Sequence, residues 1–199
     1  MIIDFGSKTI QSKIVFYGPA MSGKTTALQY LFKKFNGELV SITTSHLEKP
    51  RTLFYDYGCI ELKFGVWKLK LNLWTATGQD FYCATRSTVL QGVDGIIFVA
   101  DSRREILDEN KRSWSELLAY FGDKLVNIIP IIVCLNKQDL EKLTPVELFK
   151  EHLNLNVKVE IIKMIAIRGE NVYDAFTSIF KNIFSIHSNI KDTISHQLK

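Results

Sequence analysis

The sequence predicts an α/β fold in which a mostly parallel, six-stranded sheet carries helices on both faces. Helical and strand-like patterns alternate along the chain, which is typical of layered α/β domains. Two apolar runs, residues 95–100 and 128–135, have the composition of central parallel strands, which are buried on both faces. A glycine-rich loop also separates an apolar strand from a helix near the start of the chain.

In the first half of the chain the pattern predicts a strand, a helix and three further strands, at residues 13–17, 26–32, 38–42, 52–64 and 67–74. The last strand alternates tryptophan and leucine with lysine and asparagine, so it should have one buried and one exposed face. Gly65 lies between the last two strands, where a tight antiparallel turn is expected. The polar segment 43–50 contains a proline and is predicted to be a loop.

In the second half, strands are expected at residues 95–100, 128–135 and 159–167, each followed by a helix. The first two helices are expected to start at capping boxes, formed by Ser102 with Glu105 and by Thr144 with Glu147. The last helix is expected to cover residues 171–186. Pro145 suits a first helical turn, and Gly122 can end the first of these helices. No linker interrupts the pattern, so we expect one domain over residues 1–188 and a C-terminal tail over residues 189–199.

The composition restricts the class of protein. The chain has 199 residues, of which 46% are apolar and 23% charged, as in a globular domain with a sizeable core. The net charge of +4 is small and spread along the chain, which argues against nucleic-acid binding. The sequence has no apolar run that could span a bilayer, no signal peptide or lipid anchor, and no disulfide or zinc spacing among its cysteines. We therefore expect a cytoplasmic protein.

Residues 18–25, Gly-Pro-Ala-Met-Ser-Gly-Lys-Thr, fit the G-x-x-x-x-G-K-[ST] pattern of a phosphate-binding loop. The backbone N–H groups of such a loop form a concave anion site, which its glycines allow the phosphates to approach. Lys24 is expected to reach the outer phosphates, and the Thr25 hydroxyl is expected to bind Mg²⁺. The residues expected to contact the phosphates are Gly18, Met21, Ser22, Gly23, Lys24, Thr25 and Thr26.

A second motif, Asn136-Lys137-Gln138-Asp139, follows a central strand at the sheet edge where open α/β folds bind ligands. The Asp139 carboxylate can accept hydrogen bonds from N1–H and the 2-amino group of guanine, neither of which adenine offers. Such sites reject the wrong ligand by about 10⁴-fold or more. Asn136 would hold the loop and the base edge, and the stem of Lys137 would cover the ring. The alternative is a strand-to-helix turn that simply favours Asn and Asp.

A third segment, Thr-Ala-Thr-Gly-Gln at residues 75–79, stands where Ras-like GTPases carry Asp-x-x-Gly-Gln. With residues 51–56, Arg-Thr-Leu-Phe-Tyr-Asp, and the apolar strand within residues 92–102, it resembles the MglA-type branch of small GTPases. In that branch threonine replaces the first Asp of the motif. The resemblance covers roughly residues 13–184 and implies a P-loop NTPase fold, the Ras-like G domain.

The resemblance also implies how the γ-phosphate is handled. Gly78 would turn its N–H toward that phosphate, and Gln79 would orient the attacking water. Arg51 would supply an arginine in cis, and Lys24 would contact the phosphates. The alternative for Arg51 is a solvated loop charge.

The same resemblance assigns the metal and the base. Thr52 would be the switch threonine that binds Mg²⁺ with Thr25, although Thr43 and Thr44 compete for that role. Because Thr75 is neutral, the metal would otherwise rest on waters and phosphate oxygens. A backbone N–H at Ala166 or Ile167 would meet the guanine oxygen.

We therefore expect a slow GTPase switch that binds GTP or GDP with Mg²⁺. The resemblance implies protein effectors and a roadblock-fold regulatory protein as partners. The alternative is a guanine-nucleotide-binding scaffold with little hydrolysis, which Thr75 favours and Gln79 and Arg51 oppose. A third interpretation, an ATP-using P-loop kinase, is disfavoured by Asp139.

Overall fold

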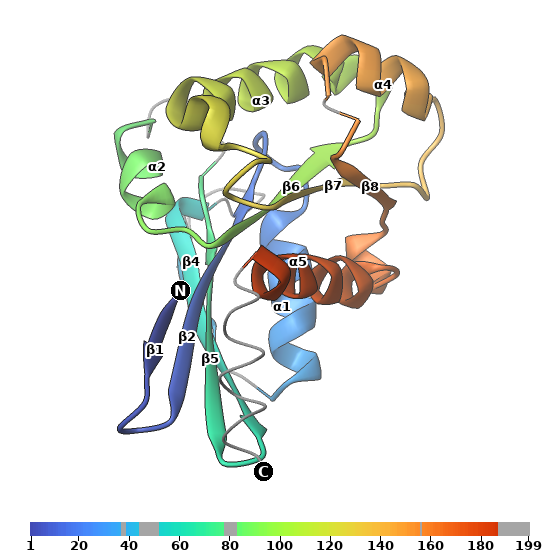
Figure 1. Cartoon of the computed structure of the whole chain (residues 1–199). Coiled ribbons are helices and arrows are strands. Elements are labelled where there is room, and N and C mark those ends of the chain that lie inside the picture. Colours follow the sequence, from blue (N-terminus) through green and yellow to red (C-terminus); the bar gives the residue numbers. More distant parts are fainter. Residues whose placement is uncertain (37–38, 44–51, 78–82, 156, 187–199) are drawn as a thin grey trace.

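The chain forms one twisted central sheet with helices on both faces (Figure 1). The computed structural model describes residues 1–36, 39–43, 52–77, 83–155 and 157–186. Within these residues the strands follow the order β3-β4-β5-β2-β6-β7-β8, and β1 pairs with β2 beside this path. β2 therefore occupies the middle of the sheet, between β5 and β6, and the glycine-rich loop that follows it leaves from the centre.

The strands are β1 (Ile2–Asp4), β2 (Thr9–Tyr17), β3 (Leu39–Thr43), β4 (Thr52–Phe64), β5 (Trp67–Thr75), β6 (Gly95–Asp101), β7 (Ile131–Asn136) and β8 (Glu160–Lys163). The helices are α1 (Lys24–Lys34), α2 (Cys83–Leu90), α3 (Leu107–Phe121), α4 (Val146–Leu153) and α5 (Val172–Ile186). β2 pairs in parallel with β5 and β6, and the pairs β6·β7 and β7·β8 are also parallel. The pairs that involve β1, β3 and β4 are antiparallel.

Two hydrophobic clusters fill the two faces of the sheet. On one face, α1 and α5 pack their apolar sides, including Leu28 and Ile179, against Ile14 and Phe16 of β2. On the other face, α3 and α4 pack against the alternate residues of the same strands (Figure 1). Consecutive strand residues point to opposite faces, so a central strand must be apolar throughout its length. All seven residues of β6 are accordingly buried.

The predicted α/β class, with a mostly parallel sheet covered on both faces, is confirmed, but the predicted number of six strands is too low. The sequence contains seven strand-like runs, one more than the expected sheet of six. All seven form strands, and β1 adds an eighth, which gives an eight-stranded sheet among the described residues. β1 is only three residues long, which is too short for an alternating pattern to stand out in the sequence. The helix α2 was also not predicted, because its apolar side is weakly marked.

The two predicted capping boxes are wrong in the structure. Before α3 the chain makes a short 3₁₀ turn, whose N-cap residue, Arg103, makes no side-chain cap. The Ser102 hydroxyl instead accepts a hydrogen bond of 2.7 Å from Gln138. At α4 the N-cap residue is Pro145, again without a side-chain cap. The predicted stop of α3 at Gly122 is confirmed, and its positive φ of 55° suits glycine.

In the described part of the chain, no helix is both long and apolar enough to cross a membrane. The tail over residues 189–199 lies outside the described residues.

Candidate functional site

The glycine-rich loop connects β2 to α1 and needs glycine at two positions. Gly18 and Gly23 have φ values of 136° and 104°, which side-chain-bearing residues rarely adopt. A Cβ on Gly18 would lie 2.2 Å from the Val99 carbonyl oxygen, and a Cβ on Gly23 would lie 2.1 Å from the Asn136 side-chain nitrogen. The loop is therefore pressed against the ends of β6 and β7, and only glycine fits these two contacts.

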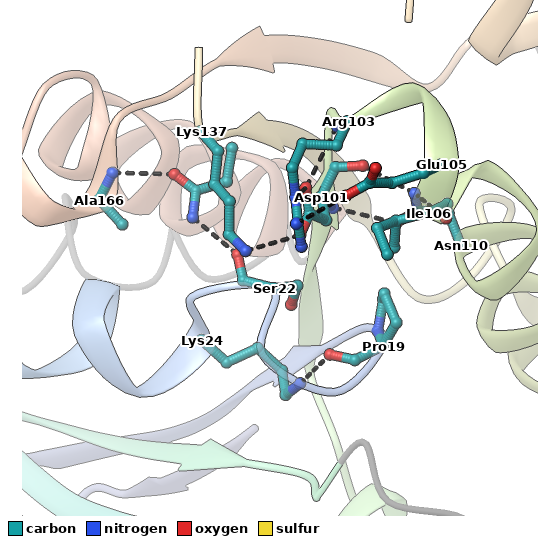
Figure 2. Close-up of polar contacts among 11 residues, drawn as sticks. Pro19, Ser22, Lys24, Asp101, Arg103, Glu105, Ile106, Asn110, Lys137 and Ala166 are labelled. Carbon is teal, nitrogen blue, oxygen red and sulfur yellow. Dashed lines mark hydrogen bonds and ion pairs between the residues drawn. The ribbon is translucent and has the colours of Figure 1, made fainter. Parts of the chain in front are cut away.

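Lys24, at the start of α1, folds back over the loop (Figure 2). Its buried Nζ donates hydrogen bonds to the carbonyls of Gly18 at 2.9 Å and Pro19 at 2.6 Å. Burial, followed by the charge of nearby Arg86, lowers the pKa of the Lys24 amine to about 7. An anion beside this amine would favour its charged form, as expected for a phosphate-binding lysine.

Asn136, the last residue of β7, connects the phosphate-binding loop to the loop that follows β8. Its Nδ2 donates to the Ser22 carbonyl at 2.7 Å, and its Oδ1 accepts from the Ala166 N–H at 2.9 Å. The side chain is buried among these groups, whereas Ile167, the next residue after Ala166, is 80% exposed. The two sequence motifs lie far apart along the chain, but they are thus bonded to each other at the carboxyl ends of the central strands.

Replacing Asn136 with alanine should therefore weaken nucleotide binding without unfolding the domain. The change leaves a buried carbonyl and a buried N–H without these partners, at about 1–3 kcal/mol each. These costs lower the stability of the fold, and the loop and the Ala166 turn are then no longer held together at the site, so we expect GDP affinity to fall by about tenfold, or about 1.4 kcal/mol. Competition against a fluorescent GDP analogue measures the change. Gln91→Ala, which removes an exposed amide, is the matched control, and equal affinities in both variants would contradict the role of Asn136.

Lys137 is held by Asp101, the last residue of β6 (Figure 2). Its Nζ lies 2.6 Å from Asp101 Oδ2, and Arg103 donates to both oxygens of the same carboxylate, at 2.8 Å to Oδ2 and 3.1 Å to Oδ1. Burial alone would raise the pKa of Asp101, but hydrogen bonds from Arg103 and Lys137 outweigh it, and the pKa lies below its usual value. No role was predicted for Asp101 from the sequence, so this contact was missed.

Arg86 of α2 bonds the segment just before Gly78 to the helical layer. Its Nε donates to the Thr77 carbonyl at 2.9 Å, and its NH1 pairs with Glu116 of α3. Glu116 also accepts a hydrogen bond of 2.7 Å from the Tyr17 hydroxyl. The residue before Gly78 is therefore held by a partly buried network that includes β2 and α3.

The predicted metal-binding hydroxyl of Thr25 meets an acid that sequence reasoning did not assign. Thr25 Oγ1 donates to Asp56 Oδ2 at 2.5 Å, and Asp56 is fully buried on β4. Thr52 begins β4, four residues before Asp56, which corresponds to about 13 Å along an extended strand. Among the described residues, no group of three or more His, Cys, Asp or Glu side chains could hold a metal.

Met21 lies in the glycine-rich loop and Thr26 in the first turn of α1. The other expected residues fall in three groups. Asp139 lies in the turn that follows β7, with its side chain exposed at the sheet edge. Arg51, Gly78, Gln79 and the competing Thr44 lie outside the described residues. Thr43 ends β3, and its backbone pairs with that of Thr52.

The sequence of this chain is similar to the sequences of known small GTPases. The family model of the ADP-ribosylation factor family matches residues 1–183. The chain is 37% identical to the mutual gliding-motility protein MglA of Myxococcus xanthus (strain DK1622), over 92% of this chain and 95% of that protein. It is 31% identical to the Ras-related protein RABA4a of Arabidopsis thaliana, over 87% and 72% of the two chains, and 27% identical to the Ras-related protein rab-11.1 of Caenorhabditis elegans, over 89% and 79%.

Proposed function

Because this chain belongs to the ADP-ribosylation factor family and is a small GTPase of the MglA type, we propose that it is a slow switch. It binds GTP or GDP together with Mg²⁺, hydrolyses GTP, and is stimulated by a roadblock-fold regulatory protein. Guanine-nucleotide binding and GTPase activity follow from the family. The metal, the regulator and the roles of individual residues are the proposal.

The observation that carries the proposal is the joining of two motifs by one side chain. Asn136 begins the base-reading segment and bonds to Ser22 in the phosphate-binding loop. A nucleotide whose phosphates lie in that loop would therefore present its base to the turn that contains Asp139. The Asp139 carboxylate would accept N1–H and the 2-amino group of guanine, and Lys137, held by Asp101, would cover the ring.

The donor set also fits a magnesium ion. Thr25 supplies a hydroxyl oxygen, and Mg²⁺ in nucleotide sites is bound by few protein oxygens together with phosphate oxygens and water. When bound, the ion neutralises charge that develops on the phosphates. Lys24 would hold the phosphates, Gln79 would orient the attacking water, and Arg51 would neutralise the transferring group.

The position of Thr52 suggests how the switch would move. About 13 Å of extended strand separates Thr52 from Asp56, whose carboxylate contacts Thr25, so in the proposed switch the start of β4 would move when Thr52 and Thr25 share a metal. Segments of this kind are ordered by the γ-phosphate and released on hydrolysis in GTPase switches.

Single-turnover GTP hydrolysis with and without a roadblock-fold protein tests the proposed function. A rate that rises when the regulator is added supports a regulated switch. Tight GTP binding with a rate that stays at the level of free GTP would instead support the scaffold alternative.

Replacing Gln79 with leucine should slow the stimulated rate while leaving GTP affinity nearly unchanged. A side chain that acts on the water changes the rate and not ground-state binding, and misplacing a reacting group costs on the order of 10²-fold. The measurement is single-turnover hydrolysis at saturating regulator. Gln91→Leu, at an exposed position, is the matched control, and an unchanged rate in Gln79→Leu would remove Gln79 from the mechanism.

A further inference from the structure

Asp56 carries a fully buried carboxylate beside the start of α1. Its Oδ2 accepts hydrogen bonds from Thr25 Oγ1 at 2.5 Å and from Thr75 Oγ1 at 2.8 Å. The Asp56 N–H donates to the same Thr75 hydroxyl at 2.8 Å. Asp56 and Thr75 thus bond to each other in both directions, and the carboxylate is aimed at the hydroxyl expected to bind the metal.

The register of the sheet explains why these residues meet. β4 and β5 are antiparallel with Tyr57 opposite Trp74, so Asp56 stands opposite Thr75 one position further along. On its other side, Thr75 pairs with Phe16 of β2, two residues before the glycine-rich loop. A carboxylate on either position 56 or position 75 would therefore lie next to Thr25.

The chemistry of the pair suits a metal site. A hydroxyl has one donor and two acceptor lone pairs, so Thr25 can donate to Asp56 and still present a lone pair to a cation. A carboxylate bonded behind a metal ligand fixes the orientation of that ligand and raises its basicity. A fully buried carboxylate also requires compensating charge, and nearby Lys24 and a divalent cation would both supply it.

We propose that Asp56 provides, from β4, the magnesium-site carboxylate that Ras-like GTPases carry on the neighbouring strand at the position of Thr75. Thr75 then serves to orient Asp56. The inference rests on the proposed function, since it assumes that magnesium accompanies the nucleotide. It replaces the expectation that, with threonine at position 75, the metal has no protein carboxylate near it.

The test is the rate at which a fluorescent GDP analogue dissociates, measured while free Mg²⁺ is titrated. In the unmodified protein Mg²⁺ should slow dissociation, and the midpoint gives the metal affinity. Asp56→Asn should shift this midpoint by about 10–100-fold to higher Mg²⁺, while the dissociation rate in EDTA stays unchanged. Glu61→Gln, an exposed carboxylate on the same strand, is the matched control and should behave like the unmodified protein.

A carboxylate exchange, Asp56→Thr combined with Thr75→Asp, protects the test if Asp56→Asn fails to fold, as judged by circular dichroism. The exchange places the carboxylate on the adjacent strand, β5, and should restore the Mg²⁺ midpoint to within a few-fold of the original. A folded Asp56→Asn with the original midpoint, or an exchange variant that binds GDP without any effect of Mg²⁺, would overturn the assignment.

Failure of the proposed function gives a different result. The unmodified protein would then bind no guanine nucleotide, with or without Mg²⁺. Tight GDP binding by the unmodified protein that does not respond to Mg²⁺ would overturn the metal part of the proposed function. A clear Mg²⁺ response that is unchanged in a folded Asp56→Asn would overturn only the assignment of Asp56.

Discussion

Replacing Asp139 with asparagine should lower the affinity for GDP and GTP by about 10⁴-fold and shift the preference toward xanthine nucleotides. The carboxylate offers two acceptors to N1–H and the 2-amino group of guanine, whereas the amide of asparagine places a donor at one of these positions. Xanthine carries a carbonyl where guanine carries the amino group, so it accepts from that donor. Sites built on such bonds reject a mismatched ligand by about 10⁴–10⁵-fold.

Competition of GDP, XDP and ADP against a fluorescent guanine nucleotide measures this change. Asp174→Asn, at an exposed position in the first turn of α5, is the matched control and should leave the preference for guanine unchanged. Equal affinity of the unmodified protein for ATP and GTP would contradict base reading by Asp139, as would an Asp139→Asn variant with unaltered preference.

Replacing Arg51 with alanine should lower the regulator-stimulated GTPase rate by about 10³–10⁵-fold, the contribution of an arginine placed on the transferring phosphate. Nucleotide affinity should change much less, because the charge is needed mainly in the transition state. Arg51→Lys should be a poor rescue, since lysine lacks the planar fork of donors. The measurement is single-turnover hydrolysis with saturating roadblock-fold protein.

Arg104→Ala, which removes an exposed arginine next to α3, is the control for the loss of a positive charge. If the regulator supplied its own arginine, Arg51→Ala would hydrolyse GTP at the unmodified rate. Full activity in both Arg51 variants would show that this residue is a surface charge, which is the alternative that the sequence left open.

The structure gives β4 a larger part in the site than the sequence indicated. Thr52 begins this strand, Asp56 lies within it, and Arg51 immediately precedes it. If the proposed switch and the proposed role of Asp56 are both right, β4 and the residue just before it would supply groups for both the metal and the transferring phosphate. A shift of β4 relative to β5 would then alter metal binding and catalysis together.

Much of the fold was predictable because its signals are local. A buried parallel strand is apolar along its whole length, so β6 and β7 stand out in the sequence. The hairpin at Gly65 was predictable because alternating strands on both sides of one glycine leave few other turns. The capping box at Ser102 failed because Gln138 bonds the Ser102 hydroxyl and a 3₁₀ turn precedes α3. The one at Thr144 failed because the helix begins one residue later, with Pro145 as its N-cap.

By itself, the sequence predicted the glycine-rich loop at residues 18–25 and the Asn136-Lys137-Gln138-Asp139 motif, because a fixed spacing within one short segment carries each of them. Only the tertiary structure decided that Asp101 holds Lys137 and that Asp56 faces Thr25. These contacts depend on strand order and register, which bring together residues 31 to 36 positions apart. A register shift of one residue would move Asp56 to the other face of the sheet, so the identity of the residue alone could not reveal its place.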